Sequence, residues 1–179
     1  SKGGQTTHVL NSKYNPCGSS SGSAVAVASG LVDIAIGTET NGSISCPSSI
    51  NGIIGFKPTV GLVSRSGIIP ISSSQDTAGP MGKTLEIVAK TLEVISGYDP
   101  NDKATSYIPE DFNFNFVGVT NNKRLDGIRF GLLNADNQHP QVIEFHNEIK
   151  AVVKKLGGEV IDIKDDRIYP DEAEYFILL

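Results

Sequence analysis

Pro16-Cys17-Gly18-Ser19-Ser20-Ser21-Gly22-Ser23 opens a stretch of the chain, 16–58, that is dense in serine, alanine and glycine. An alanine-rich run follows at 24–29 and leads into a short apolar run at 34–38. Serines ahead of such a run are good helix N-caps, because their hydroxyls accept hydrogen bonds from first-turn amides. The stretch therefore predicts a helix, apolar nearly all round and hence buried, that enters a buried strand ending at Gly37.

A second polar turn, Thr40-Asn41-Gly42-Ser43, follows the predicted strand. Small residues at this density indicate that the backbone passes close to a ligand, to neighbouring backbone or through a tight turn. Such a turn can direct several backbone N–H groups at one point, which is how proteins hold an oxyanion. The stretch is thus a candidate site for a reaction that builds negative charge on oxygen.

These blocks resemble the signature of the amidase signature family of serine hydrolases. The serine–glycine cluster at 18–23 and the turn at 37–44 carry the resemblance, and Cys46-Pro47 and the blocks 52–59, 64–65 and 76–81 extend it. It is strong from about residue 2 to residue 100 and weaker to the end. The resemblance implies an α/β fold, part of the amidase signature fold, with a mixed β-sheet core covered by helices on both faces. It also implies that 1–179 is a single partial domain that lacks the N- and C-terminal parts of the family domain.

The family's catalytic residues carry over to matching positions. Ser43 matches the nucleophile that attacks the substrate carbonyl, and Ser19 matches the bridging serine, usually preceded by a cis peptide bond, that relays the proton. The oxyanion hole maps to the backbone amides of Thr40, Asn41, Gly42 and Ser43. Because this chemistry needs only a serine, a base and amide donors, we expect neither a cofactor nor a metal.

Three further residues, Ser20, Glu39 and Asp76, are expected to support the site. Asp76 lies in a block close to the active site of the family, and we expect its carboxylate to bond loop amides. Two positions depart from the family pattern. Asn41 stands where many members have glycine, although asparagine tolerates positive φ well, and Ser45 stands where many have arginine.

The family's third catalytic residue is a lysine upstream of the bridging serine. Neither Lys2 nor Lys13 sits in that motif. We therefore expect the chain to start too late to include the lysine, to be truncated at both ends, and to be nearly inactive alone. The alternative to an enzyme is a truncated family member that serves as a non-catalytic module.

Other interpretations of the cluster fit less well. The segment 18–22 also matches the nucleophile elbow, which would make Ser20 the nucleophile, but that motif follows a hydrophobic strand and 14–17 is polar and interrupted by proline. No Gly-Lys-Ser follows the glycines, so a phosphate-binding loop is not indicated. His8 is expected to be solvated or structural. Within the family, peptide-amidase-like hydrolases are favoured, and the glutamyl-tRNA amidotransferase A-type subunit is the alternative.

Composition limits the partners. With 179 residues, 39% of them hydrophobic, and a net charge of −5, the chain suits a globular unit and not a binder of nucleic acid or anionic membrane. The expected partner is a small-molecule amide substrate. Self-association is a second candidate interaction, through apolar surfaces that truncation would expose. We expect a cytoplasmic location, with Cys17 and Cys46 as small buried thiols.

The remaining elements follow from periodicity. Thr84 caps a predicted helix that Gly97 ends, and 53–56 is a predicted strand. The alternating phenylalanines at 112–116 indicate an edge segment or a packed loop. A strand at 128–133, a helix from Pro140 and a strand at 160–163 predict a parallel unit with a right-handed crossover. A last helix is expected at 171–179.

Overall fold

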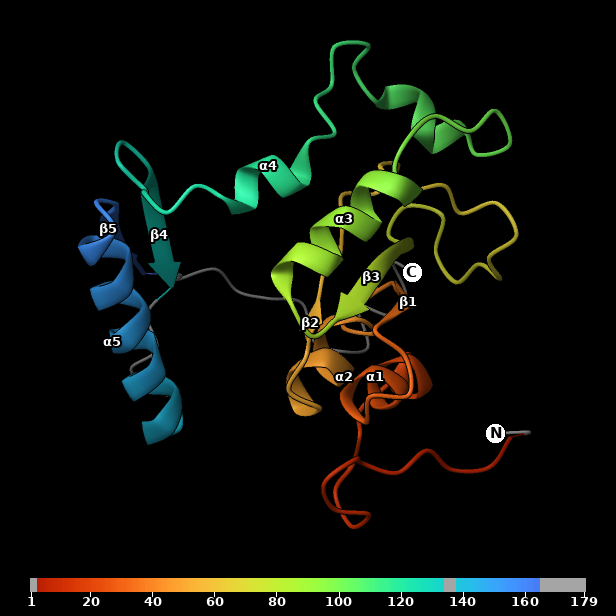
Figure 1. Cartoon of the computed structure of the whole chain (residues 1–179), viewed down its shortest axis with the longest axis horizontal. Helices are drawn as coiled ribbons and strands as arrows, with labels where there is room; N and C mark the ends of the chain where they lie inside the picture. The colour runs from red at the N-terminus through yellow and green to blue at the C-terminus, as the bar shows by residue number, and fades with distance from the viewer. Residues whose placement is uncertain (1–2, 134–137, 165–179) are drawn as a thin grey trace. The chain divides into compact units, whose positions relative to one another are not determined.

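The computed structural model describes residues 3–133 and 138–164, so the helix expected at 171–179 lies outside the described part. Contacts divide the chain into two compact units, Ser1–Thr120 and Asn121–Leu179. The first unit holds α1 (Ser21–Ala28), β1 (Ile34–Glu39), α2 (Ser45–Ile50), β2 (Ile54–Gly55), β3 (Thr77–Gly82), α3 (Leu85–Ile95), a 3₁₀ helix (Lys103–Tyr107) and α4 (Phe116–Thr120) (Figure 1). The second holds β4 (Arg129–Leu133), α5 (Pro140–Lys155) and β5 (Glu159–Ile163).

The first unit is built on an antiparallel sheet with strand order β1-β3-β2. β1 pairs with β3 along its whole length, from Ile34 opposite Gly82 to Glu39 opposite Thr77. The central strand β3 was not predicted, because its glycines and Pro80 argue against a central strand. Its six residues are nevertheless all buried, and the Pro80 carbonyl still accepts a hydrogen bond from Phe56 N. Burial and pairing on both sides here outweigh local propensity.

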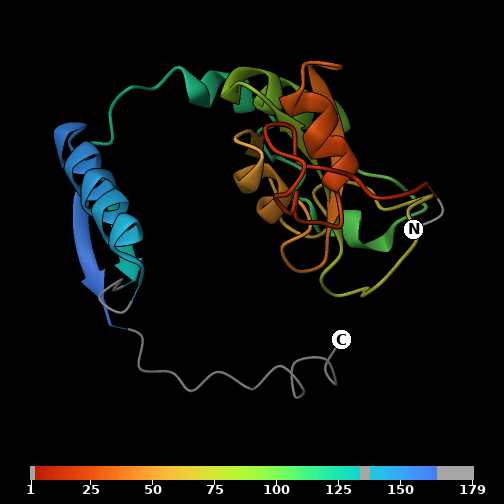
Figure 2. The same ribbon diagram turned by 90° about the horizontal axis from the view of Figure 1, so that it is seen from below.

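Alternate residues of β3 face opposite layers of helices. Met81 packs with Ala24 of α1 and with Ile44, whereas Ala78 packs with Leu92 of α3. Since successive strand residues point to opposite faces, α1 and α2 lie on one face of the sheet and α3 on the other (Figures 1 and 2). This confirms the α/β fold with helices on both faces.

Two details of the first helix and strand differ from expectation. Only Ala24 and Val27 of α1 are buried, and β1 runs past Gly37 to Glu39 with Ile36 exposed. Ser20 occupies the N-cap position, but its side chain makes no capping hydrogen bond. Helix α1 is therefore only partly covered by the described residues. The Ser20 hydroxyl does not cap the helix.

Each strand of this sheet contributes a glycine to the space around Ile44, which is fully buried. An ideal Cβ on Gly37, Gly55 or Gly79 would approach the Ile44 side chain to 3.0, 2.9 and 3.2 Å, respectively. Because the three glycines have no side chain, the Ile44 side chain can pack directly on the backbone of the sheet. Because Ile44 directly follows Ser43, the packing anchors the predicted nucleophile turn from beneath.

This close packing predicts opposite effects of two glycine substitutions. A Cβ at Gly37 would lie 2.7 Å from Met81 Sδ and 2.9 Å from Ser20 Oγ, so Gly37→Ala should lower the free energy of unfolding by about 1–3 kcal/mol. Gly22 in α1 has nothing within 4 Å of its Cβ position, and Gly22→Ala should be neutral or stabilising by up to ~1 kcal/mol. Urea unfolding of both variants measures the difference, and equal effects would contradict the packing described.

The predicted helix at 85–95 is confirmed as α3, whose N-cap Thr84 accepts a hydrogen bond from Ile87 N at 3.3 Å. Phe112 and Phe114 lie in a loop, and their rings meet edge to face with centroids 4.9 Å apart. Phe116 starts α4, which the sequence did not predict. Local ring packing and the turn of α4 here replace an edge strand.

The second unit has the predicted strand–helix–strand order. β4 and β5 pair in parallel from Arg129 opposite Glu159 to Leu133 opposite Ile163. Helix α5 lies against this two-stranded sheet (Figure 2). Pro140 occupies its first position, and a Lys150–Asp162 ion pair links it to β5. Parallel pairing is thus confirmed, while the hand of the crossover stays a prediction.

Among the described residues, no helix has both the length and the apolar character that crossing a bilayer requires.

Candidate active site

The structure brings the two predicted catalytic serine segments together. Ser20 N donates to the carbonyl oxygen of Ser43 at 3.2 Å, which joins the loop before α1 to the turn before α2. The peptide bond between Gly18 and Ser19 is cis, as the resemblance implies. Ser19 is exposed and Ser43 half-buried. The two residues therefore sit on adjoining loops at the surface of the first unit.

Ser20 uses its hydroxyl to attach α1 to β1. Its Oγ donates to Thr38 O at 3.2 Å and accepts from Thr38 N at 3.1 Å. Ser23 Oγ donates to Ile36 O at 2.8 Å and makes a second attachment to the same strand. A hydroxyl engaged on both sides is a structural tie, which argues against Ser20 as the nucleophile of an elbow.

A disulfide between Cys17 and Cys46 joins the same two loops, with Cα atoms 6.0 Å apart. The expectation of two buried free thiols is therefore wrong. The chain between the cysteines runs through α1 and β1 and folds back at Ser43, so positions 29 residues apart in sequence meet in space. Their occurrence just before Ser19 and just after Ser43 is the sequence signal that could have indicated the pairing.

Buried polar side chains reinforce this junction. Asn51 Nδ2 donates to Pro16 O at 3.0 Å and to Pro47 O at 2.9 Å. His8 is buried; its Nε2 lies 3.0 Å from Ile50 O, and its Nδ1 accepts from Leu10 N. Since Nδ1 accepts a hydrogen bond, Nε2 is the ring nitrogen that donates to Ile50 O. His8 is thus a structural contact between the N-terminal segment and the end of α2.

The predicted oxyanion turn exposes amide donors. Gly42 has φ +86°, a conformation that glycine adopts without the steric cost of a Cβ. Within the described part of the chain, the N–H groups of Thr40, Asn41 and Ser43 have no hydrogen-bond partner. Unpartnered backbone amides gathered on one turn provide donors for a developing oxyanion.

Glu39 holds the other end of this turn. Its buried carboxylate accepts hydrogen bonds from Ile44 N at 2.7 Å, from Ser45 N at 2.8 Å and from Ser45 Oγ. Burial alone would raise the pKa of Glu39, but the bonds from the Ser45, Ile44 and Gly42 amides and the Ser45 hydroxyl outweigh burial and lower it. The charged carboxylate therefore fixes the backbone that follows Ser43.

Asp76 links the turn to a neighbouring loop. One carboxylate oxygen accepts from Thr40 Oγ1 at 2.5 Å, and the other accepts from Ile71 N at 2.8 Å and Ser72 N at 2.9 Å. Burial opposes the charge, but these bonds and the nearby Arg65 hold the pKa of Asp76 below its usual range. The contacts to loop amides are of the kind expected for this residue.

The lowered pKa of Glu39 predicts a pH dependence of stability. An unfolded glutamate titrates near pH ~4.3, so below that pH the unfolded state binds more protons than the folded one. The stabilisation from Glu39 is complete above that pH and is lost as pH falls through the folded-state pKa. Glu39→Gln should cost about 1.5–3 kcal/mol at pH 7 and less at pH 3.5. Urea unfolding at both pH values measures this, with exposed Glu110→Gln as control; a pH-independent cost would contradict it.

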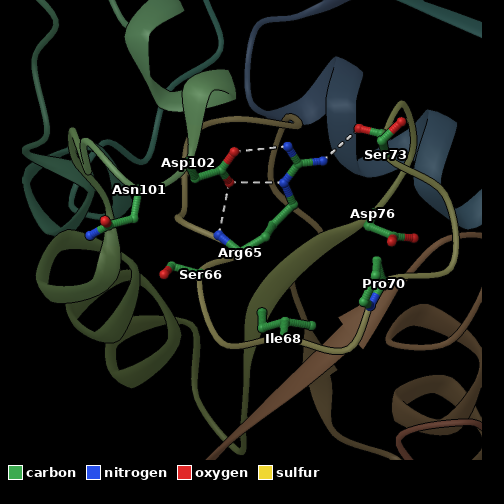
Figure 3. A pocket seen from close by; sticks show the side chains of 8 residues that line it. All are labelled: Arg65, Ser66, Ile68, Pro70, Ser73, Asp76, Asn101 and Asp102. Carbon is green, nitrogen blue, oxygen red and sulfur yellow. Dashed lines mark hydrogen bonds and ion pairs between the residues drawn. The ribbon is translucent and has the colours of Figure 1, made fainter.

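An ion pair that the sequence did not predict borders a cavity of about 200 Å³. The Arg65 guanidinium lies between Asp102 and the Ser73 carbonyl, with Nε 2.9 Å from Asp102 Oδ2 and Nη1 2.6 Å from Ser73 O (Figure 3). Hydrogen bonds from this guanidinium hold the pKa of Asp102 far below its usual range. No group of three or more histidine, cysteine or acidic side chains is placed to bind a metal in 3–133 or 138–164.

Comparison with known proteins supplies an independent test. The family model described as Amidase matches residues 1–177. A putative amidase of Arthroderma benhamiae is 39% identical over 96% of this chain and 30% of its own length. The crystal structure of native peptide amidase from Stenotrophomonas maltophilia matches with a TM-score of 0.83 and 46% identity, over 91% of this chain and 34% of that chain.

The A-type subunit of glutamyl-tRNA(Gln) amidotransferase from Synechococcus is also similar, at 34% identity over 98% of this chain and 36% of that protein. The chain thus spans about a third of the length of the relatives it matches.

Proposed function

The chain belongs to the amidase family, and we propose that the full-length protein hydrolyses a carboxamide C–N bond through an acyl-enzyme on Ser43. In this scheme Ser43 Oγ attacks the carbonyl carbon while the turn amides stabilise the negative oxygen. Ser19 accepts the Ser43 proton as it passes its own proton to the base, and the reverse transfer through Ser19 then protonates the leaving nitrogen. Water then attacks the ester, regenerating Ser43 and releasing the acid. The general base is the lysine that the family resemblance places upstream of Ser19.

One observation carries the proposal: the N–H groups of Thr40, Asn41 and Ser43 have no partner among the described residues, and the Ser19 loop is joined to their turn. The Gly42 amide, which the sequence predicted as a further donor, bonds instead to the Glu39 carboxylate. The loop and the turn are joined by the hydrogen bond from Ser20 N to Ser43 O and the Cys17–Cys46 disulfide. The Glu39 carboxylate and the buried Ile44 hold the same backbone from the other side. A nucleophile, a relay and an oxyanion site held this firmly suit acyl transfer.

The substrate class follows from the relatives. Similarity to peptide amidase, at 46% identity, favours a small-molecule or peptide carboxamide as substrate. Similarity to the A-type amidotransferase protein, at 34% identity, makes a glutamine-hydrolysing component of a complex the second candidate. No cofactor has a role in either scheme.

The test is ammonia release by the purified full-length protein. We expect the protein alone to release ammonia from a peptide amide, and Ser43→Ala to abolish that release. Ammonia released from glutamine only when partner subunits are present would favour the second candidate. Ammonia release that does not depend on Ser43 would refute both candidates.

Four expectations from the sequence stay proposals. Residues 1–179 are proposed to form part of one amidase domain, and neither nucleic acid nor membrane is proposed as a direct partner. Self-association remains a matter for measurement of the oligomeric state. The cytoplasmic location also stays a prediction, and the Cys17–Cys46 disulfide argues against it, because disulfides persist mainly in oxidising compartments.

A further inference from the structure

The loop 65–76, here called the isoleucine loop, has a rigid polar base. At one end, Arg65 donates to Asp102 and to the carbonyl of Ser73, so this side chain closes the loop on itself. At the other end, the Asp76 carboxylate accepts from the amides of Ile71 and Ser72. Such bonds fix the backbone of the loop from inside.

The tip of the loop is apolar and exposed. Ile69 is 90% exposed and Ile71 is 72% exposed, whereas Ile68 is half-buried against the core formed by Val63, Ala78 and Leu92. Large apolar side chains held outward by a rigid base mark a binding surface more often than isolated exposed residues do. The exposed tip is therefore a candidate binding surface.

The isoleucine loop and the proposed oxyanion turn border one hollow. Thr38 and Glu39 of β1 and Thr40 of the turn line one side of it, and Ile68, Ile69 and Ile71 line it from the loop. Its volume of about 20 Å³ is too small for a substrate, but it shows that the loop tip and Thr40, the first residue of the turn, border the same space. The hydrogen bond between Thr40 Oγ1 and Asp76 sets their separation.

We propose that Ile69 and Ile71 form the apolar wall against which a hydrophobic group of the amide substrate packs. The proposal rests on the function proposed for Ser43. A carbonyl held by the turn amides places its substituents beside Thr40, and the Asp76 link keeps the apolar tip at that place. The wall therefore selects aliphatic over small or polar groups next to the scissile bond.

The test compares kcat/KM of the full-length protein for two series of amides. One series lengthens the acyl group of primary amides from propanamide to hexanamide, and the other lengthens the N-alkyl group of an acetamide. We expect Ile69→Ser and Ile71→Ser each to reduce the preference for the longer group by about 3- to 10-fold in one of the series. Leu31→Ser, which changes a side chain that is 79% exposed and does not line the hollow, should leave the preference unchanged.

The outcomes separate the inference from the function on which it rests. If hydrolysis requires Ser43 but Ile69→Ser and Ile71→Ser both leave the chain-length preference unchanged, the apolar wall is refuted and the proposed function is not. Hydrolysis that persists in Ser43→Ala would overturn the proposed function. Binding gives a second readout without turnover, because hexanamide added to the Ser43→Ala protein should shift the NMR methyl signals of Ile69 and Ile71. If saturating hexanamide shifts neither methyl signal, Ile69 and Ile71 do not form the proposed apolar wall.

Discussion

Replacing Ser43 with alanine in the full-length protein is expected to lower kcat/KM for amide hydrolysis by about 10⁴- to 10⁶-fold. The substitution removes the hydroxyl oxygen that we propose forms the acyl-enzyme, while the turn amides and Glu39 stay in place. Residual activity would come from oxyanion stabilisation and substrate binding. Initial rates of ammonia release at several substrate concentrations measure the change. Unchanged unfolding of the variant in urea would show that the loss is chemical.

Ser49→Ala is the matched control for this experiment. Ser49 is an exposed serine on α2, in the helix that directly follows the Ser43 turn. The control should keep activity within about twofold, because surface substitutions away from buried contacts usually change little. A Ser43→Ala protein as active as the Ser49→Ala protein would contradict the assignment of the nucleophile.

Removing the Cys17–Cys46 disulfide by Cys17→Ala and Cys46→Ala together is expected to lower the free energy of unfolding by about 2–4 kcal/mol. The cross-link closes a loop that contains both Ser19 and Ser43, so opening it gives the unfolded chain more conformational freedom. Urea unfolding with and without a thiol reductant measures the effect. The unsubstituted protein should lose stability on reduction, and the double variant should not respond.

The same experiment tests whether the disulfide serves the site. Asn51 and the Ser20–Ser43 hydrogen bond also hold the junction, so we expect the double variant to fold and to keep partial activity. An unfolding free energy that is the same in oxidised, reduced and doubly substituted protein would contradict a stabilising cross-link.

The roles of Ser19 and Ser43 could be predicted only through the family resemblance. The candidate site itself could be located because its density of small residues and its polar turn are local in sequence. The same is true of α3 and of the β4–α5–β5 unit, where an N-cap and a helical or alternating period agree. Where local preference and tertiary packing favour the same structure, the sequence suffices.

The contacts that hold the site together are non-local, and the sequence did not reveal them. Strand β3 carries a glycine at position 79 because a Cβ there would collide with the Phe56 carbonyl oxygen and crowd Ile44, and this demand appears only once the sheet is formed. The Cys17–Cys46 pairing and the Arg65–Asp102 ion pair likewise join segments 29 and 37 residues apart. The positions of the cysteines beside the two serine segments could have indicated the disulfide, whereas no local pattern pairs Arg65 with Asp102.

A fluorophosphonate reaction with the full-length protein, followed by peptide mapping of the adduct by mass spectrometry, tests whether Ser43 is the nucleophile. Fluorophosphonates form a covalent bond with a serine that is activated as a nucleophile. The account predicts a single adduct, located on Ser43 and absent from the Ser43→Ala variant. An adduct on Ser20 or on any other serine, with Ser43 unmodified, would contradict it.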